Sequence, residues 1–395
     1  MVLVVLLAVS LGATAGDRED VEMLQIQSRP RRMPVIVDTD MDTDDQMALA
    51  FLLGEPSIEV KAITTLADGW SNQWSGVQNA MRLTQAWGQP DIPVAYSTRY
   101  NGDTQLNMMQ PNDLPNPTLL TGIGNFLSEF VPLPFNVRPP SWMYASRLIR
   151  ETLRKSEHKV DIIELGPLTN LAQVLQEEPE LFRKKVRRLY MSGGLIVKRR
   201  EEGTSEVWPY SSGPDGTSFT GKPPGTSWNI FSDPIAANSV FSFGVPLVIG
   251  SSEYEDENQF STNDTSFIPS SCPLKTAEFL RRAITMLPVA NNESESELRY
   301  WDESLAVLAI QMIRHHGRKD AAVCKKWERK RFAVMMEAGN DPNVSGGRYS
   351  RLLENPFGQR AVQCVESNET EFKTAYYSGI CGIYYESPAN QRHYW

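Results

Sequence analysis

Five aspartates crowd a fifteen-residue segment that begins at Val35 and reads VIVDTDMDTDDQMAL. They occupy positions 38, 40, 42, 44 and 45, directly after a β-branched run. Two like unit charges about 4 Å apart repel each other by roughly 1 kcal/mol in water and by about 4 kcal/mol near a protein surface. Oxygen ligands gathered this closely are typical of sites that bind Ca²⁺ or Mg²⁺. The segment therefore predicts a divalent-cation site.

Two well-known acidic loops do not match this segment. Counted from Asp38, an EF-hand loop requires Gly at its sixth position and Glu at its twelfth, where this chain has Thr43 and Leu49. A phosphatase that forms an aspartyl phosphate requires Thr or Val at the fifth position, where this chain has Asp42. Both alternatives are therefore excluded.

A third alternative is a helix N-terminus whose acidic residues favour the helix dipole. It accounts for Asp44 and Asp45, but not for Asp38 and Asp40 at the end of an apolar strand. Thr43 is predicted as the N-cap of the helix that follows, with Gln three residues later completing a capping box. The acids are thus expected in the loop after the first strand and in the first helical turn.

Short β-branched runs alternate with longer helical patterns from Pro34 onward. Strands are predicted at 34–38, 59–65, 92–96, 160–164, 187–191 and 245–250. Helices are predicted at 43–53, 75–87, 142–156, 168–177, 233–241, 273–286 and 302–315. This alternation predicts an α/β fold with an open, mainly parallel, twisted sheet flanked by helices. Such Rossmann-like sheets bind ligands at the carboxyl ends of their strands.

The amino terminus predicts a secreted protein. Residues 1–15 combine an apolar run with small residues suited to signal-peptidase cleavage. Residues 16–33 predict a disordered leader, residues 34–395 a single folded domain, and residues 198–226 a long surface loop. The net charge of -9 argues against a nucleic-acid partner. No later stretch approaches the roughly 18 apolar residues that a membrane span requires.

Sequons and cysteines agree with secretion. Glycosylation is predicted at Asn263, Asn292, Asn343 and Asn368. The four cysteines are Cys272, Cys324, Cys364 and Cys381. In an oxidising compartment they would form two disulfides, for which three pairings exist, while the alternative is four buried free thiols.

The aspartate segment, in its DTDxDTDDxxAL form, resembles the signature of the nucleoside hydrolases, the inosine-uridine-preferring nucleosidase superfamily. Four further blocks follow in the family's order. The segment LGPLTNLA at 165–172 looks like the family's GPLTNxA segment, and YMSGG at 190–194 looks like its MGG strand end. WNIFSDP at 228–234 looks like its EFNIxxDP segment, and YWD at 300–302 looks like its late HD or WD pair. The resemblance is closest to secreted plant members and to the purine-preferring branch, and no block matches from about residue 316 onward.

The resemblance implies a Ca²⁺ site made by the aspartate segment and two distant positions. Asp40 and Asp45 are implied as ligands, together with the backbone carbonyl of Leu165 and the carboxylate of Asp302. Asp40 is also implied as the general base for the attacking water, and Asp38 as a supporting carboxylate beneath the metal. Mg²⁺ would fit less well, because it demands strict octahedral geometry.

Other matched positions are implied to bind the nucleoside. Asp44 and Asn229 match positions that hydrogen-bond the ribose hydroxyls. Met191 belongs to the block that looks like MGG, although an ungapped match places Ser192 at the methionine. Trp301 stands where some members carry His. Core packing is the ordinary role of a tryptophan, but beside Asp302 its ring is expected to stack on a nucleobase, and a large π-face suits a purine.

Three positions depart from the family pattern. Ser227 replaces a Glu that contacts the 5′ end of the ribose, so handling of the 5′ position is open. Asp68 stands in place of an asparagine near the second strand. Asp42 replaces a Gly and adds charge near the metal.

These observations predict a secreted, Ca²⁺-dependent ribonucleoside hydrolase that releases free base and ribose, with a purine preference and no nucleic-acid or membrane partner. The resemblance also implies self-association. Two alternatives remain open: a non-catalytic relative that only binds nucleosides, and a hydrolase of a modified ribosyl compound.

Overall fold

The computed structural model describes most of the chain from Arg32 onward. The described residues are 32–66, 71, 73–97, 126–133, 138–193, 228–319, 321–338 and 348–387. The predicted signal peptide, the leader up to Arg31 and the predicted loop at 198–226 lie outside them. None of the helices in the described part is long and apolar enough to cross a membrane.

Nine strands of the described residues form one sheet, in the order β3-β2-β1-β4-β5-β6-β9-β7-β8. They are β1 (Met33–Thr39), β2 (Ile58–Thr65), β3 (Val94–Tyr96), β4 (Val160–Glu164), β5 (Val186–Ser192), β6 (Leu247–Gly250), β7 (Cys324–Ala338), β8 (Arg348–Glu354) and β9 (Gln359–Ser367). The six strands β1 to β6 run parallel, and β9 joins them parallel to β6. Only β7 runs antiparallel to its two neighbours. The predicted α/β fold with a mainly parallel sheet is confirmed.

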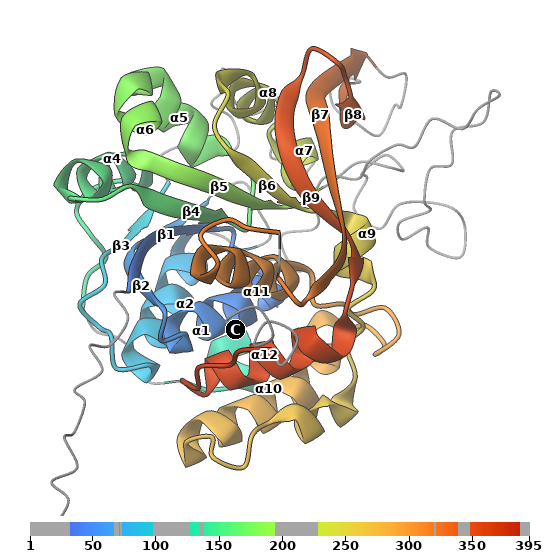
Figure 1. The fold of residues 1–395 in the computed structure, drawn as a ribbon. Coiled ribbons are helices and arrows are strands. Elements are labelled where there is room, and N and C mark those ends of the chain that lie inside the picture. Colours follow the sequence, from blue (N-terminus) through green and yellow to red (C-terminus); the bar gives the residue numbers. More distant parts are fainter. Residues whose placement is uncertain are drawn as a thin grey trace, which may run out of the picture. The chain divides into compact units, whose positions relative to one another are not determined.

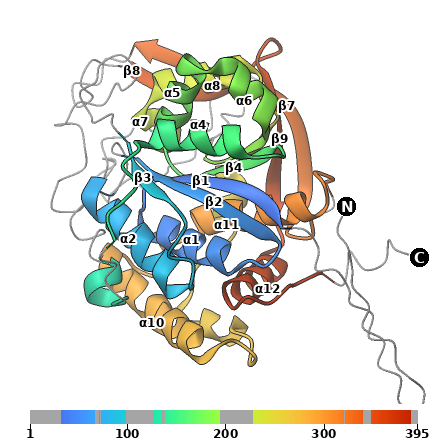
Figure 2. The same ribbon diagram turned by 90° about the vertical axis from the view of Figure 1, so that its left-hand side faces the viewer.

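Helices cover both faces of the sheet (Figures 1 and 2). One face carries α1 (Thr43–Gly54), α2 (Gln73–Ala86), α10 (Leu274–Asn291), α11 (Trp301–Arg314) and α12 (Glu369–Ile380). The other carries α4 (Ala145–Lys155), α5 (Thr169–Glu177), α6 (Pro179–Lys185) and α8 (Pro234–Phe243). Short segments complete the description: α7 (Trp228–Ser232), α9 (Ser252–Asp256), the π-helical turn η1 (Phe126–Phe130) and the 3₁₀ helix η2 (Thr262–Phe267).

The central strand β1 is apolar on both sides because both of its faces are covered. Val35 and Val37 pack into the core beneath α1 and α11, while Ile36 packs into the core on the α5 side. This alternation is the period of two expected of a strand. Every predicted strand and helix is present. The strands β7, β8 and β9 and the helices α6, α7, α9 and α12 were not predicted.

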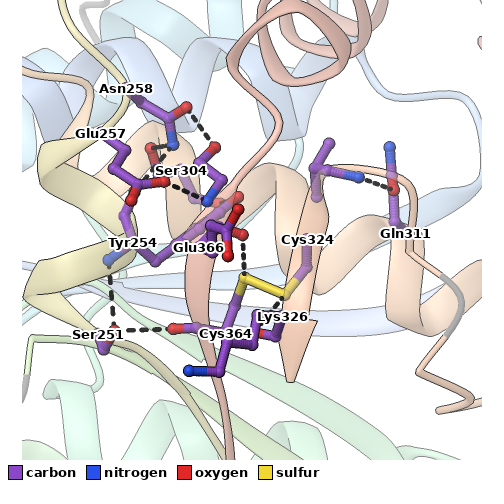
Figure 3. The surroundings of a disulfide bond; sticks show 12 residues. Ser251, Tyr254, Glu257, Asn258, Ser304, Gln311, Cys324, Lys326, Cys364 and Glu366 are labelled. Carbon is purple, nitrogen blue, oxygen red and sulfur yellow. Dashed lines mark hydrogen bonds between the residues drawn. A yellow bond between two sulfur atoms is a disulfide. The ribbon is translucent and has the colours of Figure 1, made fainter. Parts of the chain in front are cut away.

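Two disulfides join the last third of the chain, and they select one of the three pairings that the sequence left open. Cys272 pairs with Cys381, and Cys324 pairs with Cys364. The first ties the end of α12 to the segment before α10. The second joins β7 to β9 and is drawn in Figure 3. The expectation of two disulfides is confirmed, and the alternative of four free thiols is wrong.

Candidate functional site

The site begins at the sharp turn between β1 and α1. Met41 in this turn has a left-handed backbone, with φ of 59°. Its N–H donates to Thr39 Oγ1 at 3.0 Å, and its carbonyl accepts from Gln46 Nε2 at 3.0 Å. A left-handed backbone is uncommon outside glycine, so the surrounding bonds hold a conformation that the residue itself disfavours. The turn is therefore a rigid platform for the acids on either side of it.

Asp42, not Thr43, is the N-cap of α1, so the predicted cap is wrong by one residue. The Asp42 side chain accepts from the Thr43 N–H at 2.5 Å, and Asp45 at the third helical position accepts from the Asp42 N–H at 3.2 Å. The two acids thus form the capping box that had been assigned to Thr43 and Gln46. Asp42 therefore has a structural task in addition to the charge it adds.

Three carboxylates meet where α1 and α11 begin. One ligand oxygen from each of Asp44, Asp45 and Asp302 lies within 4.8 Å of the others. Asp45 and Asp302 are almost fully buried. Burial, and then the charges of neighbouring acids, raise the pKa of both carboxyls well above the usual value. Burial also raises the pKa of Asp44, to about 6, although backbone N–H groups oppose the rise.

Asp40 lies against the same group. A hydrogen bond with its side chain opposes the burial-driven rise in the pKa of Asp45, and its charge raises the pKa of Asp302. Gly166 lets the end of β4 lie against Asp40, because a Cβ there would come within 2.9 Å of the Asp40 nitrogen and 2.5 Å of Leu66. The structure thus brings Asp40, Asp44, Asp45 and Asp302 together.

The end of β4 lines the site on the other side of β1. The Leu165 N–H donates to the Asp38 carbonyl at 2.8 Å. The Leu165 carbonyl accepts from Asn229 Nδ2 at 2.9 Å, and that same amide group reaches the Ser192 carbonyl at 3.2 Å. A carbonyl oxygen has two lone pairs, so Leu165 retains one acceptor position. Asn229 therefore joins the ends of β4 and β5.

Asp38 lies beneath these groups and is completely buried. Its Oδ1 accepts from Thr64 Oγ1 at 2.6 Å and from Asn170 Nδ2 at 2.9 Å. These bonds anchor it to β2 and α5. Since β1 lies between β2 and β4, and the chain progresses outward from β1 in both directions, the acids occupy the topological switch point of the sheet.

Trp301 is half-buried at the start of α11. Its indole N–H donates to Asp256 Oδ1 at 3.4 Å. Burial raises the pKa of Asp256 to about 7, against the opposing effects of this bond and of the Arg299 charge. Trp301 lines a cavity of about 10 Å³ together with polar side chains that include Asp44 and Glu303. This cavity has room for about one water molecule.

Of the remaining predicted residues, some lie outside the described part of the chain and others lie in the core or at the surface. Asp68, Ser227 and the sequon at Asn343 lie outside the described residues. Met191 is fully buried in the core on the α5 side of the sheet. The next residue, Ser192, hydrogen-bonds Asp302 and lowers its pKa. It is therefore Ser192 that the structure brings to the acids. Two sequons, at Asn263 and Asn292, are exposed, and Asn368, at the start of α12, is half-buried.

Sequence reasoning missed three buried acids of the site region. Glu164 ends β4, Glu303 follows Asp302 directly, and Glu255 in α9 accepts from Ser192 Oγ at 3.1 Å. Burial is the main cause that raises the pKa of each carboxyl well above its usual value. Glu164 and Glu303 directly adjoin matched blocks, which was an available signal. Glu255 had only its place after β6, at the same edge of the sheet.

Comparisons with known proteins agree with this geometry. The family model of the inosine-uridine preferring nucleoside hydrolases matches residues 35–351. A curated relative, the pyrimidine-specific ribonucleoside hydrolase RihA of Salmonella enteritidis PT4 (strain P125109), is 30% identical over 244 residues. That match covers 59% of this chain and spans only 64% of the relative's length.

Solved structures share the fold at low identity. A plant nucleoside hydrolase, PpNRh1, has a TM-score of 0.65 at 19% identity and covers 89% of this chain and 99% of its own. A purine-preferring ribonucleoside hydrolase from Gardnerella vaginalis has a TM-score of 0.65 at 18% identity and covers 88% of this chain and 98% of its own.

Proposed function

The chain belongs to the inosine-uridine preferring nucleoside hydrolase family, and on that premise we propose that it hydrolyses the N-glycosidic bond of ribonucleosides to free base and ribose. One observation carries the proposal: Asp40 and the carboxylates of Asp44, Asp45 and Asp302 converge at the switch point of the sheet. Acids so crowded and buried are stable only with protons or with a cation among them.

The donor set fits Ca²⁺. Asp45 and Asp302 of the grouped carboxylates, Asp40 beside them and the Leu165 carbonyl offer hard oxygen ligands, and waters or sugar hydroxyls would complete the six to eight that this ion prefers. When bound, the cation would lower the pKa of a water and neutralise the carboxylates. Calcium in particular is our proposal, since carboxylate oxygens alone do not select one divalent ion.

The chain's own residues supply the remaining chemistry. Cleavage of the bond to the base develops positive charge on the sugar, as in other glycoside hydrolyses. Asp40 accepts the proton of the attacking water. Asp44 and the Oδ1 of Asn229 accept hydrogen bonds from ribose hydroxyls; both Asn229 bonds in the structure use its nitrogen, which leaves that oxygen for the sugar. Ser192 and Glu255 close the adjacent wall.

We propose a purine preference, based on Trp301. An indole presents a large π-face, and the indole N–H is already engaged by Asp256, so the ring is held for stacking. No imidazole stands at this position, so the departing base would not take its proton from a histidine there. The relatives differ in preference, because RihA is named as pyrimidine-specific and the Gardnerella enzyme as purine-preferring.

We also propose that the protein is secreted and glycosylated and that its partners are small nucleosides. Two disulfides among the four cysteines support an oxidising compartment. Exposure of Asn263 and Asn292 is compatible with glycans at those positions. Self-association stays a prediction from the resemblance.

The test is a panel of inosine, adenosine, uridine and a 5′-substituted nucleoside, assayed for reducing sugar with and without a chelator. We expect purine nucleosides to react fastest, and the chelator to abolish turnover until Ca²⁺ is restored. Asp40→Asn should lower kcat about 10²- to 10⁴-fold, while Asp91→Asn at an exposed surface position should not. Full activity of Asp40→Asn would contradict the proposal. Binding without turnover in the wild-type protein would favour the non-catalytic alternative.

A further inference from the structure

The carboxyl-terminal helix α12 lies outside the stretch that matches the family, yet it packs directly on α1 (Figure 1). Gly54 at the end of α1 and Gly379 in α12 approach so closely that a Cβ on Gly54 would lie 2.5 Å from the Gly379 carbonyl oxygen. Tyr376 in α12 donates to the Met47 carbonyl at 3.4 Å. The tail of the chain is therefore part of the wall behind the helix that carries Asp44 and Asp45.

The same helix reaches the start of α11 through Tyr300, the residue before Trp301 and Asp302. The Tyr300 ring is buried and contacts Phe372 and Tyr376 of α12, with ring centroids 5.3 and 5.6 Å apart. Tyr300 has no side-chain capping role at the start of α11. The Tyr300 ring therefore packs against α12 and joins the start of α11 to that helix.

A short chain of hydrogen bonds fixes the Tyr300 hydroxyl. It donates to Asp264 Oδ2 at 2.8 Å and lies 2.7 Å from the hydroxyl of Tyr377. A phenol has one hydrogen, and that of Tyr300 is used on Asp264, so Tyr377 is the donor between the two rings. Lys373 Nζ reaches Asp264 Oδ1 at 2.9 Å, which makes both oxygens of this carboxylate partners of α12 or of Tyr300.

The backbone of Tyr300 is held as firmly as its ring. Its N–H donates to the Asn258 carbonyl at 3.0 Å, and its own carbonyl accepts from the hydroxyl of Ser304. Asn258 Nδ2 in turn donates to Ser304 Oγ at 2.8 Å, and its Oδ1 accepts from Ser367 Oγ at 2.6 Å. Figure 3 shows the bonds of Asn258 and Ser304 in the surroundings of the disulfide that joins β7 to β9. Ring and backbone together leave Asp302 little freedom to shift.

We propose that Lys373, Asp264 and Tyr377 are positioning residues, which hold Tyr300 and so place the carboxylate of Asp302 against those of Asp44 and Asp45. In this way α12 sets the affinity of the site for its cation. The inference rests on the cation site of the proposed function. A buried ion pair adds little to stability by itself, but it can specify one geometry.

The test measures Ca²⁺ affinity by titration calorimetry of the full-length, disulfide-bonded protein, with no substrate present. Tyr300→Phe keeps the ring and removes the bond to Asp264, and we expect it to weaken binding about three- to tenfold. Lys373→Met should weaken binding more, and Lys373→Arg should restore most of it, because a guanidinium can still pair with Asp264. The Tyr300→Phe and Tyr377→Phe effects should be far from additive, since both hydroxyls act through one network.

Tyr385→Phe is the matched control. It removes a tail tyrosine hydroxyl that donates to Glu371 of α12 at 2.7 Å, away from Tyr300. We expect it to lower the melting temperature slightly and to leave Ca²⁺ affinity unchanged. If Tyr300→Phe and Lys373→Met bind Ca²⁺ as tightly as the wild type, the inference is wrong and the network is merely structural.

The outcomes separate this inference from the proposed function. Wild-type protein that binds Ca²⁺ but cleaves no nucleoside would overturn the function alone, and the variants would still decide the inference. Wild-type protein that binds no Ca²⁺ would overturn the inference outright.

Discussion

A buried ion pair and a crowded group of three acids in this molecule stand in opposite electrostatic settings. Asp264 is 4% exposed and forms an ion pair with Lys373, which is 6% exposed. Asp44, Asp45 and Asp302 are gathered just as tightly, but among the described residues no lysine or arginine forms an ion pair with them. The first group is complete within the chain, whereas the second requires protons or a cation from outside.

The difference distinguishes acids that stabilise one geometry of the fold from acids that are suited to bind a ligand. A buried charge that is paired fixes a geometry and is strongly destabilising only when its partner is removed. A buried charge left without its counter-charge lowers stability until a ligand binds. Substitutions in the two groups should therefore have effects of opposite sign.

The largest effect is expected from Asp264→Asn. It leaves Lys373 buried with the half-exposed Glu369 as its remaining ion-pair partner, and should lower the free energy of unfolding by about 3 to 5 kcal/mol. Urea denaturation measures this change. Replacing both partners, as Lys373→Met with Asp264→Leu, should recover much of the loss. A double variant less stable than the single one would contradict the comparison.

A smaller effect is expected when Ca²⁺ is added to the wild-type protein. Binding at a concentration 100-fold above Kd should stabilise the fold by about 2.7 kcal/mol. Melting curves with Ca²⁺ and with a chelator measure the difference. Asp264→Asn, if it stays folded, should show a smaller Ca²⁺-dependent increase at the same Ca²⁺ concentration, because the acids that bind the ion remain but the bond that holds Tyr300 is weakened. If no divalent ion changed the melting temperature of the wild-type protein, the contrast between the Asp264–Lys373 ion pair and the three-acid group would be wrong.

Asp302→Asn should stabilise the protein in the presence of a chelator, by about 1 to 2 kcal/mol. The reason is the raised pKa of this carboxyl, caused first by burial and then by Asp44. An acid whose pKa is raised in the folded state destabilises that state when it ionises, and a neutral amide avoids this. The same variant should lose the Ca²⁺-dependent increase in melting temperature. Destabilisation in the chelator would count against the interpretation.

The electrostatic setting of Asp256 is intermediate between that of Asp264 and that of the three-acid group. Its substitution is expected to change stability least. Its partial partners are the Trp301 N–H and the Arg299 charge, and burial still raises its pKa to about 7. Its ionisation should therefore reduce stability as the pH rises from the unfolded value, near 4, to about 7. Asp256→Asn should gain on the order of 1 kcal/mol relative to wild type between pH 5 and pH 8, after allowance for solvent screening. If the free energy of unfolding of Asp256→Asn and that of the wild type changed with pH in the same way, this assignment would be wrong.

The part of the fold predicted from sequence is the part whose signals are local. Strands β1 to β6 are short apolar runs between turn residues, and they follow one another in parallel units. β7 carries no such signal, because its first half is charged and much of it is exposed. Its partner β9 lies further along the chain, and pairing at that distance is not encoded in a window of neighbouring residues.

The candidate site divides in the same way. The spacing of the aspartates alone predicted a cation site at the end of β1. Asp302 required the family resemblance, since an Asp-Glu pair in the first turn of a helix is expected from the helix dipole alone. The N-cap was misplaced because Asp42 and Thr43 are both good capping residues and local sequence does not choose between them. Nothing in the sequence indicated that Tyr300 would be held by a lysine seventy-three positions later.

The packing of α12 on α1 has a consequence for biogenesis. The ribosome makes α1 among the first elements and α12 last, so the flank of α1 around Met47 and Phe51 waits for nearly the whole chain before it is covered. During translation that flank is exposed apolar surface, of the kind that favours aggregation and chaperone binding. A product truncated before residue 369 would lack this cover permanently. Synthesis that stops early should therefore yield insoluble protein rather than a soluble protein of lower stability.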